Sequence, residues 1–477
     1  MQTTDHPPAA RRVETLVVGA GQAGLALSHE LTLRGRDHVV LERGRIGERW
    51  RSERWDSLAL LTPNWLNGLP GAAELPDRDG FLARDELVAH LERYARSFGA
   101  PVVEGVTVLS VTPGFEVETD AGTWCADNVV VASGACDVPA IPACGAAAPV
   151  AAFHASAYRN PEELPDGAVL VVGAGPSGQQ IALELSRAGR DVVLSAGRHT
   201  RIPRRYRGRD AFAWLNALGH FAKTIDQMSD PVAARRAASF PLDGRGGGED
   251  LDLGVLERAG VRLTGRLTGF AGRHALFADD LVENARAADA SMRRTLARID
   301  AVAGGPAEHV ADVELEPGPR SLDLSGEGFG SIVWATGYRR TYPWLHADVL
   351  DPHGEIEHHR GVTDEPGLYA LGLRFLHRRD SHFLGGVGRD ATYIAEHIAA
   401  RGWARTMEER DALALAAWGR ILRARGPAGG TAAAGGPRRA AWRPGGRPRP
   451  PSPPRRRPRP GSRRGRWRGA RPFPEAR

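Results

Sequence analysis

Two stretches of the chain repeat one pattern of apolar and polar positions. Each has a short run of β-branched apolar residues, a glycine-rich turn, a stretch with helical apolar spacing and a second apolar run, first over residues 14–41 and again over residues 168–194. This order is typical of a strand–helix–strand unit. A glycine-rich turn at the first strand–helix junction is the context in which such a unit binds a dinucleotide. The pattern therefore predicts two dinucleotide-binding units about 150 residues apart.

The segments around these units complete the predicted fold. Between the units, the pattern predicts an amphipathic helix over residues 85–98 and strands within residues 102–132. Residues 198–323 have weak periodicity, and we interpret them as a cap on the second unit that shapes the substrate pocket. Strands resume at Ser331, and a last helix is expected over residues 390–400. The expected fold class is α/β, with two Rossmann-like dinucleotide-binding domains, the second inserted in the first.

This organisation divides the chain into four expected parts. Their bounds are 12–160 for the first piece of the first domain, 161–325 for the second domain with an insertion at about 205–323, 326–425 for the second piece of the first domain, and 426–477 for a tail. Arg, Pro and Gly dominate the tail without apolar periodicity. The tail is therefore predicted to be disordered.

Positive charge is concentrated in that tail. The net charge is +6, but residues 431–477 hold 15 Arg and one Glu, which leaves the rest of the chain mildly acidic. A nucleic-acid partner is therefore not expected, and binding of nucleic acid or acidic lipid by the tail is the alternative. No run approaches the ~20 apolar residues of a membrane-spanning helix, and no signal peptide precedes the first strand. These features predict a cytoplasmic protein without a membrane span.

The cysteines and the acidic residues exclude two kinds of chemistry. Cys125, Cys136 and Cys144 form no C-x-x-C pair, which indicates a reducing compartment and argues against the redox dithiol of a disulfide reductase. The His, Asp and Glu residues lack the spacing of metal ligands, so no metal site is predicted.

The first glycine turn has the sequence G-x-G-x-x-G. Its first glycine permits a tight turn, its second lets the backbone approach a pyrophosphate, and its third lets the helix pack on the strand. Glu42 ends the second strand, where a carboxylate accepts hydrogen bonds from a ribose. The residues predicted to contact the cofactor here are Gly19, Gly21, Gln22, Ala23, Gly24, Glu42 and Arg43.

The second glycine turn has the same form but a different ending. No acid follows its second strand, and arginines come instead. A carboxylate would repel a 2′-phosphate, whereas guanidinium groups bind one, so NADPH is favoured over NADH. The alternative is that these arginines form a solvated surface cluster. The predicted contacts are Gly173, Gly175, Pro176, Ser177, Gly178, Arg198 and Arg201.

Three further segments combine small residues with glycine. Two are the ends of apolar runs, where the backbone can pass close to a cofactor or cross between domains, and the third begins the last predicted helix. An ordinary strand–turn is the alternative at the first two. The candidate cofactor-binding residues are Ser133 and Gly134, then Ala335, Thr336 and Gly337, and finally Gly385 and Gly386.

The order of two G-x-G-x-x-G turns, an A-T-G-Y segment and a glycine-rich last helix resembles flavin-containing monooxygenases. It resembles more closely the bacterial flavoproteins that are often labelled potassium-transport flavoproteins. The resemblance covers about residues 13–402. It implies that the first domain binds FAD and the second binds NADPH.

The resemblance also assigns roles to individual residues. The family's F-x-G-x-x-x-H-x-x-x-W/Y fingerprint is matched in its second half by His154 and Tyr158, but its F-x-G is absent. His154 is therefore a candidate catalytic residue, with an interdomain hydrogen bond as the alternative. Trp50 falls in a segment that lies over the isoalloxazine. Asn64 falls where related enzymes place an amide near the flavin N5, and a Pro-Asn turn is its alternative reading.

The implied function is an FAD-dependent, NADPH-using monooxygenase. Dioxygen would add at the flavin C4a to give a hydroperoxide that oxygenates a small molecule. The missing F-x-G favours an alternative, an NADPH-dependent flavin reductase or oxidase without oxygen insertion. A redox-sensing subunit linked to ion transport is a third hypothesis. The expected partners are a small-molecule substrate and dioxygen, and a homodimer is left open.

Overall fold

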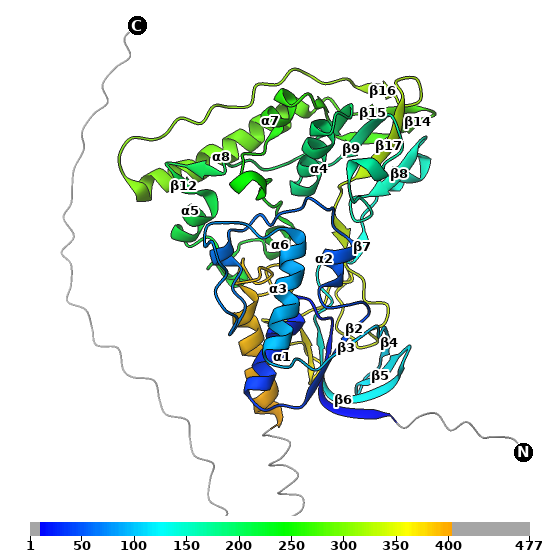
Figure 1. Cartoon of the computed structure of the whole chain (residues 1–477), viewed down its shortest axis with the longest axis vertical. Coiled ribbons are helices and arrows are strands. Elements are labelled where there is room, and N and C mark those ends of the chain that lie inside the picture. Colours follow the sequence, from blue (N-terminus) through cyan, green and yellow to red (C-terminus); the bar gives the residue numbers. More distant parts are fainter. Residues whose placement is uncertain (1–9, 403–477) are drawn as a thin grey trace, which may run out of the picture. The chain divides into compact units, whose positions relative to one another are not determined.

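The first glycine turn joins two neighbouring parallel strands inside a mixed sheet (Figure 1). In the computed structural model, which describes residues 10–402, this sheet has seven strands in the order β3-β2-β1-β6-β5-β4, with β19 beside β6. They are β1 (Arg11–Val18), β2 (His38–Glu42), β3 (Val102–Glu104), β4 (Val108–Val111), β5 (Glu116–Thr119), β6 (Gly122–Val131) and β19 (Leu368–Ala370). Only the β4–β5–β6 hairpins are antiparallel, so the sheet has the parallel core of a Rossmann unit.

Three helices cover one face of this sheet. They are α1 (Gln22–Leu33), α3 (Arg84–Ser97) and a helix over residues 387–402. Their apolar sides share one core with alternate strand residues, and Leu27, Leu87 and Ile394 are all fully buried in it. The other face of the sheet carries a second core formed with the loops of residues 342–356. Successive apolar residues of the strands point to opposite faces, so the sheet contributes to a core on each face.

The second sheet repeats this arrangement. Within the described residues its five strands are all parallel, in the order β13-β10-β9-β17-β8. They are β8 (Ala151–His154), β9 (Ala168–Val172), β10 (Val192–Ser195), β13 (Arg262–Thr264) and β17 (Phe329–Trp334). Two helices, α4 (Pro176–Arg187) and α7 (Leu253–Arg258), share one core with it. An antiparallel sheet of β14 (Leu267–Ala271), β15 (His274–Phe277) and β16 (Ser321–Asp323) contributes to the core on its other face.

The second sheet lies between β6 and β19 of the first sheet along the chain, so the second Rossmann unit is inserted in the first, as the sequence predicts. Two of its strands fall outside the bounds predicted for the second domain. β8 precedes residue 160, and β17 follows residue 325. Both pair in register with the second sheet because their apolar residues complete its central layer. Two short antiparallel strands, β7 (Val138–Pro139) and β18 (Tyr338–Arg339), pair where the chain passes between the two units.

The stretch predicted as a cap contains several short elements and one long helix. The helix α8 (Leu281–Ala303) lies within the predicted stretch, and β13 from the same stretch is an edge strand of the second sheet. The remaining elements are α2 (Glu48–Ser52) before it, and β11 (Arg205–Tyr206), β12 (Arg209–Asp210), α5 (Ala211–Ala217) and α6 (Pro231–Arg236) within it. No helix in residues 10–402 is long and apolar enough to cross a membrane. The predicted disordered tail, 426–477, lies outside the described residues.

Candidate active site

The first glycine turn leaves one position open and two tightly packed. A Cβ on Gly24 would lie 1.9 Å from the carbonyl oxygen of Gly19, so the third glycine is required for α1 to pack on the turn. Gly19 itself has φ +108° and packs against the carbonyl of Ala132. At Gly21 a Cβ would meet no atom within 4 Å. This open backbone at the N-terminus of α1 is where the pyrophosphate of a dinucleotide would approach the free N–H groups of the helix.

Glu42 holds the glycine turn in place. Its Oε2 accepts a hydrogen bond from the backbone N–H of Ala20 at 2.7 Å, and its Oε1 accepts one from Gly44 at 3.1 Å. The next residue, Arg43, is exposed and lies 3.5 Å from Glu53. Both Glu42 and Arg43 line the cavity described next. The carboxylate lies at the end of β2, and its contact with a ribose stays a prediction.

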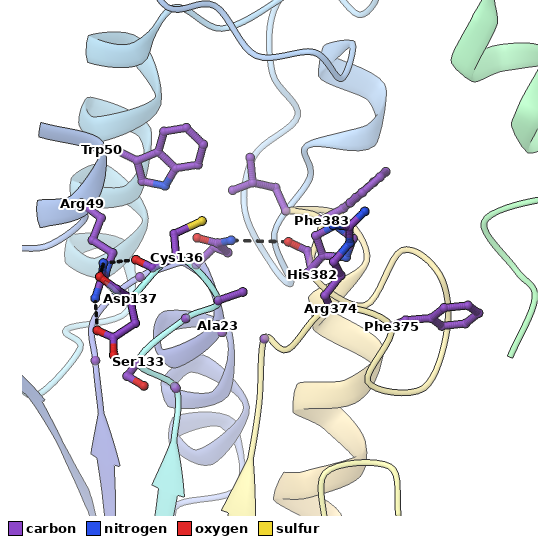
Figure 2. Close-up of a pocket in the computed structure, with 18 of the residues that line it drawn as sticks. Ala23, Arg49, Trp50, Ser133, Cys136, Asp137, Arg374, Phe375, His382 and Phe383 are labelled. Carbon is purple, nitrogen blue, oxygen red and sulfur yellow. Dashed lines mark hydrogen bonds and ion pairs between the residues drawn. The ribbon is translucent and has the colours of Figure 1, made fainter. Parts of the chain in front are cut away.

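A cavity of about 880 Å³ begins at this turn. It runs along the segments 47–54 and 132–138 and ends among residues of the cap and of the segment 372–384. Figure 2 shows residues from the two ends of the cavity, with Arg49, Trp50, Ser133, Cys136 and Asp137 on one side, Ala23 near the middle, and Arg374, Phe375, His382 and Phe383 on the other. Its volume falls in the range of cofactor and substrate pockets.

One side of the cavity is built by charged contacts. Arg49 lies 2.8 Å from Asp137 and donates a hydrogen bond to the carbonyl oxygen of Cys136. These contacts tie α2 to the segment that follows Ser133 and Gly134 (Figure 2). Trp50 lies beside Arg54, whose guanidinium is 5.4 Å from the indole ring. The predicted residues Trp50, Ser133 and Gly134 therefore lie together along the cavity, with Gln22 donating to the carbonyl of His382 at 3.4 Å.

The opposite side is aromatic. The rings of Phe212 and Phe221 stack at 5.6 Å, and Phe383 contacts them at 6.4 Å and 5.6 Å. Phe212 comes from α5 of the cap, so the cap does line the pocket, as expected. Leu215 and Phe240 extend this apolar surface. We call the group Phe212, Phe221 and Phe383 the phenylalanine wall.

Two arginines stand next to the phenylalanine wall. Arg374 donates to the carbonyl of Ala237 and lies 3.3 Å from the hydroxyl of Ser239. The guanidinium of Arg379 lies 4.9 Å from the ring of Phe375. Burial, and then the charge of Arg379, lower the pKa of Arg374. Both arginines line the cavity.

The second glycine turn repeats the geometry of the first. Gly173 has φ +113° and packs on the carbonyl of Ala335, and a Cβ on Gly178 would lie 1.8 Å from the carbonyl of Gly173. A Cβ on Gly175 would meet nothing within 4 Å. Pro176 and Ser177 form the first turn of α4. None of these residues lines the 880 Å³ cavity, so the second open turn belongs to a separate place on the molecule.

The arginines after β10 have different environments. Arg198 is exposed, and within residues 10–402 it has no ion pair or hydrogen bond. Arg201 is 11% exposed and pairs with Asp252 at 2.8 Å and with Asp289 at 2.5 Å. Two carboxylates therefore contact the guanidinium of Arg201, and its role as a phosphate ligand stays a prediction. Of these two arginines, only Arg198 has no carboxylate partner among residues 10–402.

Several predicted residues lie away from the cavity. His154 bonds to Gly337, and Thr336 donates to the carbonyl of Ala140 at 2.8 Å, so this segment supports the crossing between the two units. Asn64 uses its amide to hold the carbonyls of Pro76 and Asp77. Both side chains are engaged outside the lining of the cavity, and a catalytic role for His154 or Asn64 stays a prediction.

The predicted glycines of the last helix also serve packing. A Cβ on Gly385 would lie 2.4 Å from the carbonyl of Leu66, and one on Gly386 would lie 1.8 Å from that of Asp380. These close approaches to protein backbone place Phe383 and Leu384 on the cavity. A cofactor contact by Gly385 or Gly386 stays a prediction.

The residues present fit a bound FAD. The open Gly21, the carboxylate of Glu42 and the continuous cavity past Trp50 supply a pyrophosphate cradle, a ribose acceptor and room for a ring system. The two-unit fold with two open glycine turns defines the class of protein as a flavoprotein oxidoreductase that also has a pyridine-nucleotide domain. A family model described as pyridine nucleotide-disulphide oxidoreductase matches residues 16–216.

The relatives specify the family within this class. The chain is 32% identical over 402 residues to an uncharacterized CzcO-like oxidoreductase of Geobacillus kaustophilus, covering 81% of this chain and 98% of the relative. It is 29% identical to the indole-3-pyruvate monooxygenase YUCCA1 of Oryza sativa, covering 86% and 97%. The flavin-containing monooxygenase of Stenotrophomonas maltophilia shares its fold, with a TM-score of 0.54, 20% identity and coverage of 82% and 99%. The chain belongs to the CzcO-like family of flavin monooxygenase-like oxidoreductases.

Sequence reasoning missed the residues that close the cavity. Arg49, Asp137, Phe212, Arg374 and Arg379 are brought to it by tertiary contacts over long separations. Arg49 and Asp137, for example, are 88 residues apart. The one local signal was the glycine-rich segment before the last helix, which includes Phe383.

Proposed function

We propose that this protein is an FAD-dependent, NADPH-using monooxygenase that acts on a small, largely apolar molecule. The observation that carries this proposal is the single cavity that joins an open FAD-type glycine turn to the phenylalanine wall. A substrate held against that wall would share one enclosed space with the cofactor. Bound FAD would supply hydride acceptance and activation of dioxygen.

The chain's own residues would bind, orient and exclude water. The turn at Gly21 and the carboxylate of Glu42 would fix one end of FAD. The phenylalanine wall presents no hydrogen-bonding group, so it would keep water from the reacting atoms. Because the wall comes partly from the cap, movement of α5 would control access to the cavity.

NADPH is the proposed electron donor because of Arg198. This arginine follows β10, the position from which a Rossmann unit contacts the 2′ position of the adenosine ribose. Its exposure and lack of a partner in the described part of the chain leave its fork of N–H donors available for a 2′-phosphate.

A reductase or oxidase without oxygen insertion is the second candidate. The observation in its favour is that Asn64 and His154, the two groups expected to assist oxygen chemistry, are engaged outside the cavity. In such an enzyme every NADPH consumed in air without another acceptor would yield reduced oxygen, with no oxygenated product.

Labelled dioxygen separates the two candidates. The FAD-loaded enzyme is supplied with NADPH and ¹⁸O₂ in the presence of amines, sulfides, ketones or indoles, and NADPH oxidation, peroxide release and product mass are measured together. Incorporation of one ¹⁸O atom per NADPH into a product supports the monooxygenase. Stoichiometric peroxide release with every substrate class, and no labelled product, would establish the oxidase instead.

A further inference from the structure

Arg374 and Arg379 are two partly buried arginines of the cavity lining that have no carboxylate partner within the described residues, unlike Arg204 and Arg245 elsewhere in the chain. Arg204, which is 1% exposed, lies 2.8 Å from Asp210, and the guanidinium of Arg245 lies 2.7 Å from Asp243. Among residues 10–402, neither Arg374 nor Arg379 has an acidic side chain within 4 Å. Arg374 donates hydrogen bonds to neutral oxygens, whereas the guanidinium of Arg379 lies over the ring of Phe375 and its buried Nε has no hydrogen-bond partner within the described structure.

An uncompensated guanidinium pair in a pocket is costly to the folded protein. Removing a charge from water without a counter-charge disfavours folding, and proteins normally pair such groups. Here the burial of each group lowers its pKa, but guanidinium remains charged at neutral pH. The pocket therefore has a localised positive potential that an anionic ligand would neutralise.

The neighbouring histidines His220 and His382 add no further positive charge to the pair at pH 7. Burial, followed by the charges of Arg374 and Arg379, lowers the pKa of His382 to about 3. Burial and then the charge of Arg379 lower the pKa of His220 to about 4. Both imidazoles are therefore neutral at pH 7. The Nδ1 atom of His382 is buried without a hydrogen-bond partner within the described structure, which leaves a further polar atom for a ligand.

The apolar surface beside the arginines limits what this anion can be. The phenylalanine wall continues directly from His220 and His382, whose rings contact Phe221 at 5.5 Å and Phe383 at 4.8 Å. A ligand that fills both parts has an apolar, ring-sized body and one planar anionic end. Guanidinium groups match the geometry of a carboxylate, with two parallel N–H···O bonds. A polyanion without an apolar body would leave the wall uncovered.

We propose that Arg374 and Arg379 form a carboxylate-binding subsite, and that the substrate is an apolar carboxylic acid whose ring or branched chain lies against the phenylalanine wall. This inference rests on the proposed function for the identity of the site, but the binding step needs neither oxygen nor turnover. The same anion chemistry could come from a phosphate of NADPH, so the two sources must be separated by experiment.

The probe is phenylacetate, and its matched control is phenylacetamide, which has the same ring and shape but no charge. Each is titrated into the FAD-loaded enzyme without NADPH, and the change in the visible flavin absorption gives the Kd. We expect phenylacetate to bind about 10- to 100-fold more tightly than the amide, as for the loss of a charged hydrogen bond. Equal affinities for acid and amide would overturn the proposal, whatever the outcome of the ¹⁸O₂ experiment.

Variants test which arginine carries the charge. Arg379→Gln is expected to weaken phenylacetate binding about 10- to 100-fold, and Arg379→Lys to restore part of it. Arg320→Gln is the matched control, because this arginine is 73% exposed and does not line the cavity. If Arg379→Gln instead raises the KM for NADPH and leaves phenylacetate binding unchanged, the pair binds cofactor phosphate and the proposal is wrong. Should Arg379→Gln fail to retain FAD, the lysine variant and the acid-to-amide ratio of the unaltered enzyme still decide.

Discussion

The Nε2–H of His154 donates a hydrogen bond to the carbonyl oxygen of Gly337 over 2.9 Å, although the two residues are 183 positions apart. The backbone N–H of Ser156 donates to the Nδ1 of the same ring at 3.1 Å, which fixes the proton on Nε2. Gly337 has φ +82° and begins the passage from β17 back towards the first unit. The side chain of His154 thus links the end of β8 to this passage by a hydrogen bond.

Replacement of His154 should therefore affect stability more than chemistry. We expect His154→Ala to lower the free energy of unfolding by about 1–3 kcal/mol, because the carbonyl of Gly337 loses its buried partner. The rate of NADPH oxidation at saturating NADPH should stay within a few-fold of the unaltered enzyme. Thermal or denaturant unfolding and steady-state kinetics measure the two effects. A hundredfold loss of the NADPH oxidation rate with unchanged stability would contradict this prediction and indicate a catalytic role for His154.

Buried histidines should make the fold sensitive to mild acid. Burial lowers the pKa of His382 to about 3, and burial with neighbouring positive charge lowers the pKa values of His220 and His358 to about 4. Since the unfolded chain protonates these rings near pH 6.5, it binds more protons than the folded chain between about pH 6.5 and 4. Stability is therefore fully present above pH 6.5 and is lost as the pH falls, by up to about 1.4 kcal/mol per pH unit for each ring. Denaturant unfolding at pH 7.5, 6.5 and 5.5 tests this slope. A free energy of unfolding that is constant or rises over this interval would contradict the prediction.

Asp390 should act in the opposite direction. Burial, partly offset by Ser381 and by nearby arginines, raises the pKa of this carboxyl to about 6, so at pH 7 the folded chain holds a charge it disfavours. Its Oδ2 has no hydrogen-bond partner in the described structure. We expect Asp390→Asn to raise the free energy of unfolding at pH 7 by about 2–3 kcal/mol. The gain should shrink as the pH falls from 6 towards 4, and it should vanish only well below the ordinary pKa of 3.8, where Asp390 is protonated in both states. A loss of stability at pH 7 would show that the carboxylate is paired.

The sequence predicted the parts of the site that local chain geometry determines. Both glycine turns and Glu42 follow from the order of strand, turn and helix, because contacts such as Gly24 with Gly19 and Glu42 with Ala20 lie within one βαβ unit. Arg201 and Asn64 could not be assigned in this way, since their partners depend on how distant segments pack. Asp289, for example, is 88 residues from Arg201 and reaches it only because α8 lies across the cap. Arg374 was missed for the same reason, as its contact to the carbonyl of Ala237 spans 137 residues.

The open and packed glycines of the first turn should respond differently to one added methyl group. Gly21 has φ −79°, which any residue adopts, and free space around its Cβ position. Gly21→Ala should fold but retain less FAD, because the methyl group stands where the pyrophosphate approaches. Gly24→Ala should fail to fold stably, because its Cβ would lie 1.9 Å from a carbonyl oxygen. Flavin-to-protein ratio and thermal unfolding separate the two effects. Gly175→Ala is the control and is expected to keep FAD. Full FAD retention by Gly21→Ala would show that the pyrophosphate does not bind at Gly21.

Arg198 and Arg201 offer a matched pair for the choice between NADPH and NADH. Arg198 is exposed and unpaired in the part of the chain that the structure describes, so Arg198→Gln should raise the KM for NADPH about 10- to 100-fold and leave that for NADH unchanged. Arg201 is bound by Asp252 and Asp289, the latter 2% exposed, so Arg201→Gln should instead destabilise the fold by about 3 kcal/mol through an unpaired buried carboxylate. Kinetics with both nucleotides and denaturant unfolding of both variants measure this contrast. If Arg198→Gln raises the KM for NADPH and for NADH equally, Arg198 does not bind the 2′-phosphate. The lost interaction would then lie in the part that the two nucleotides share.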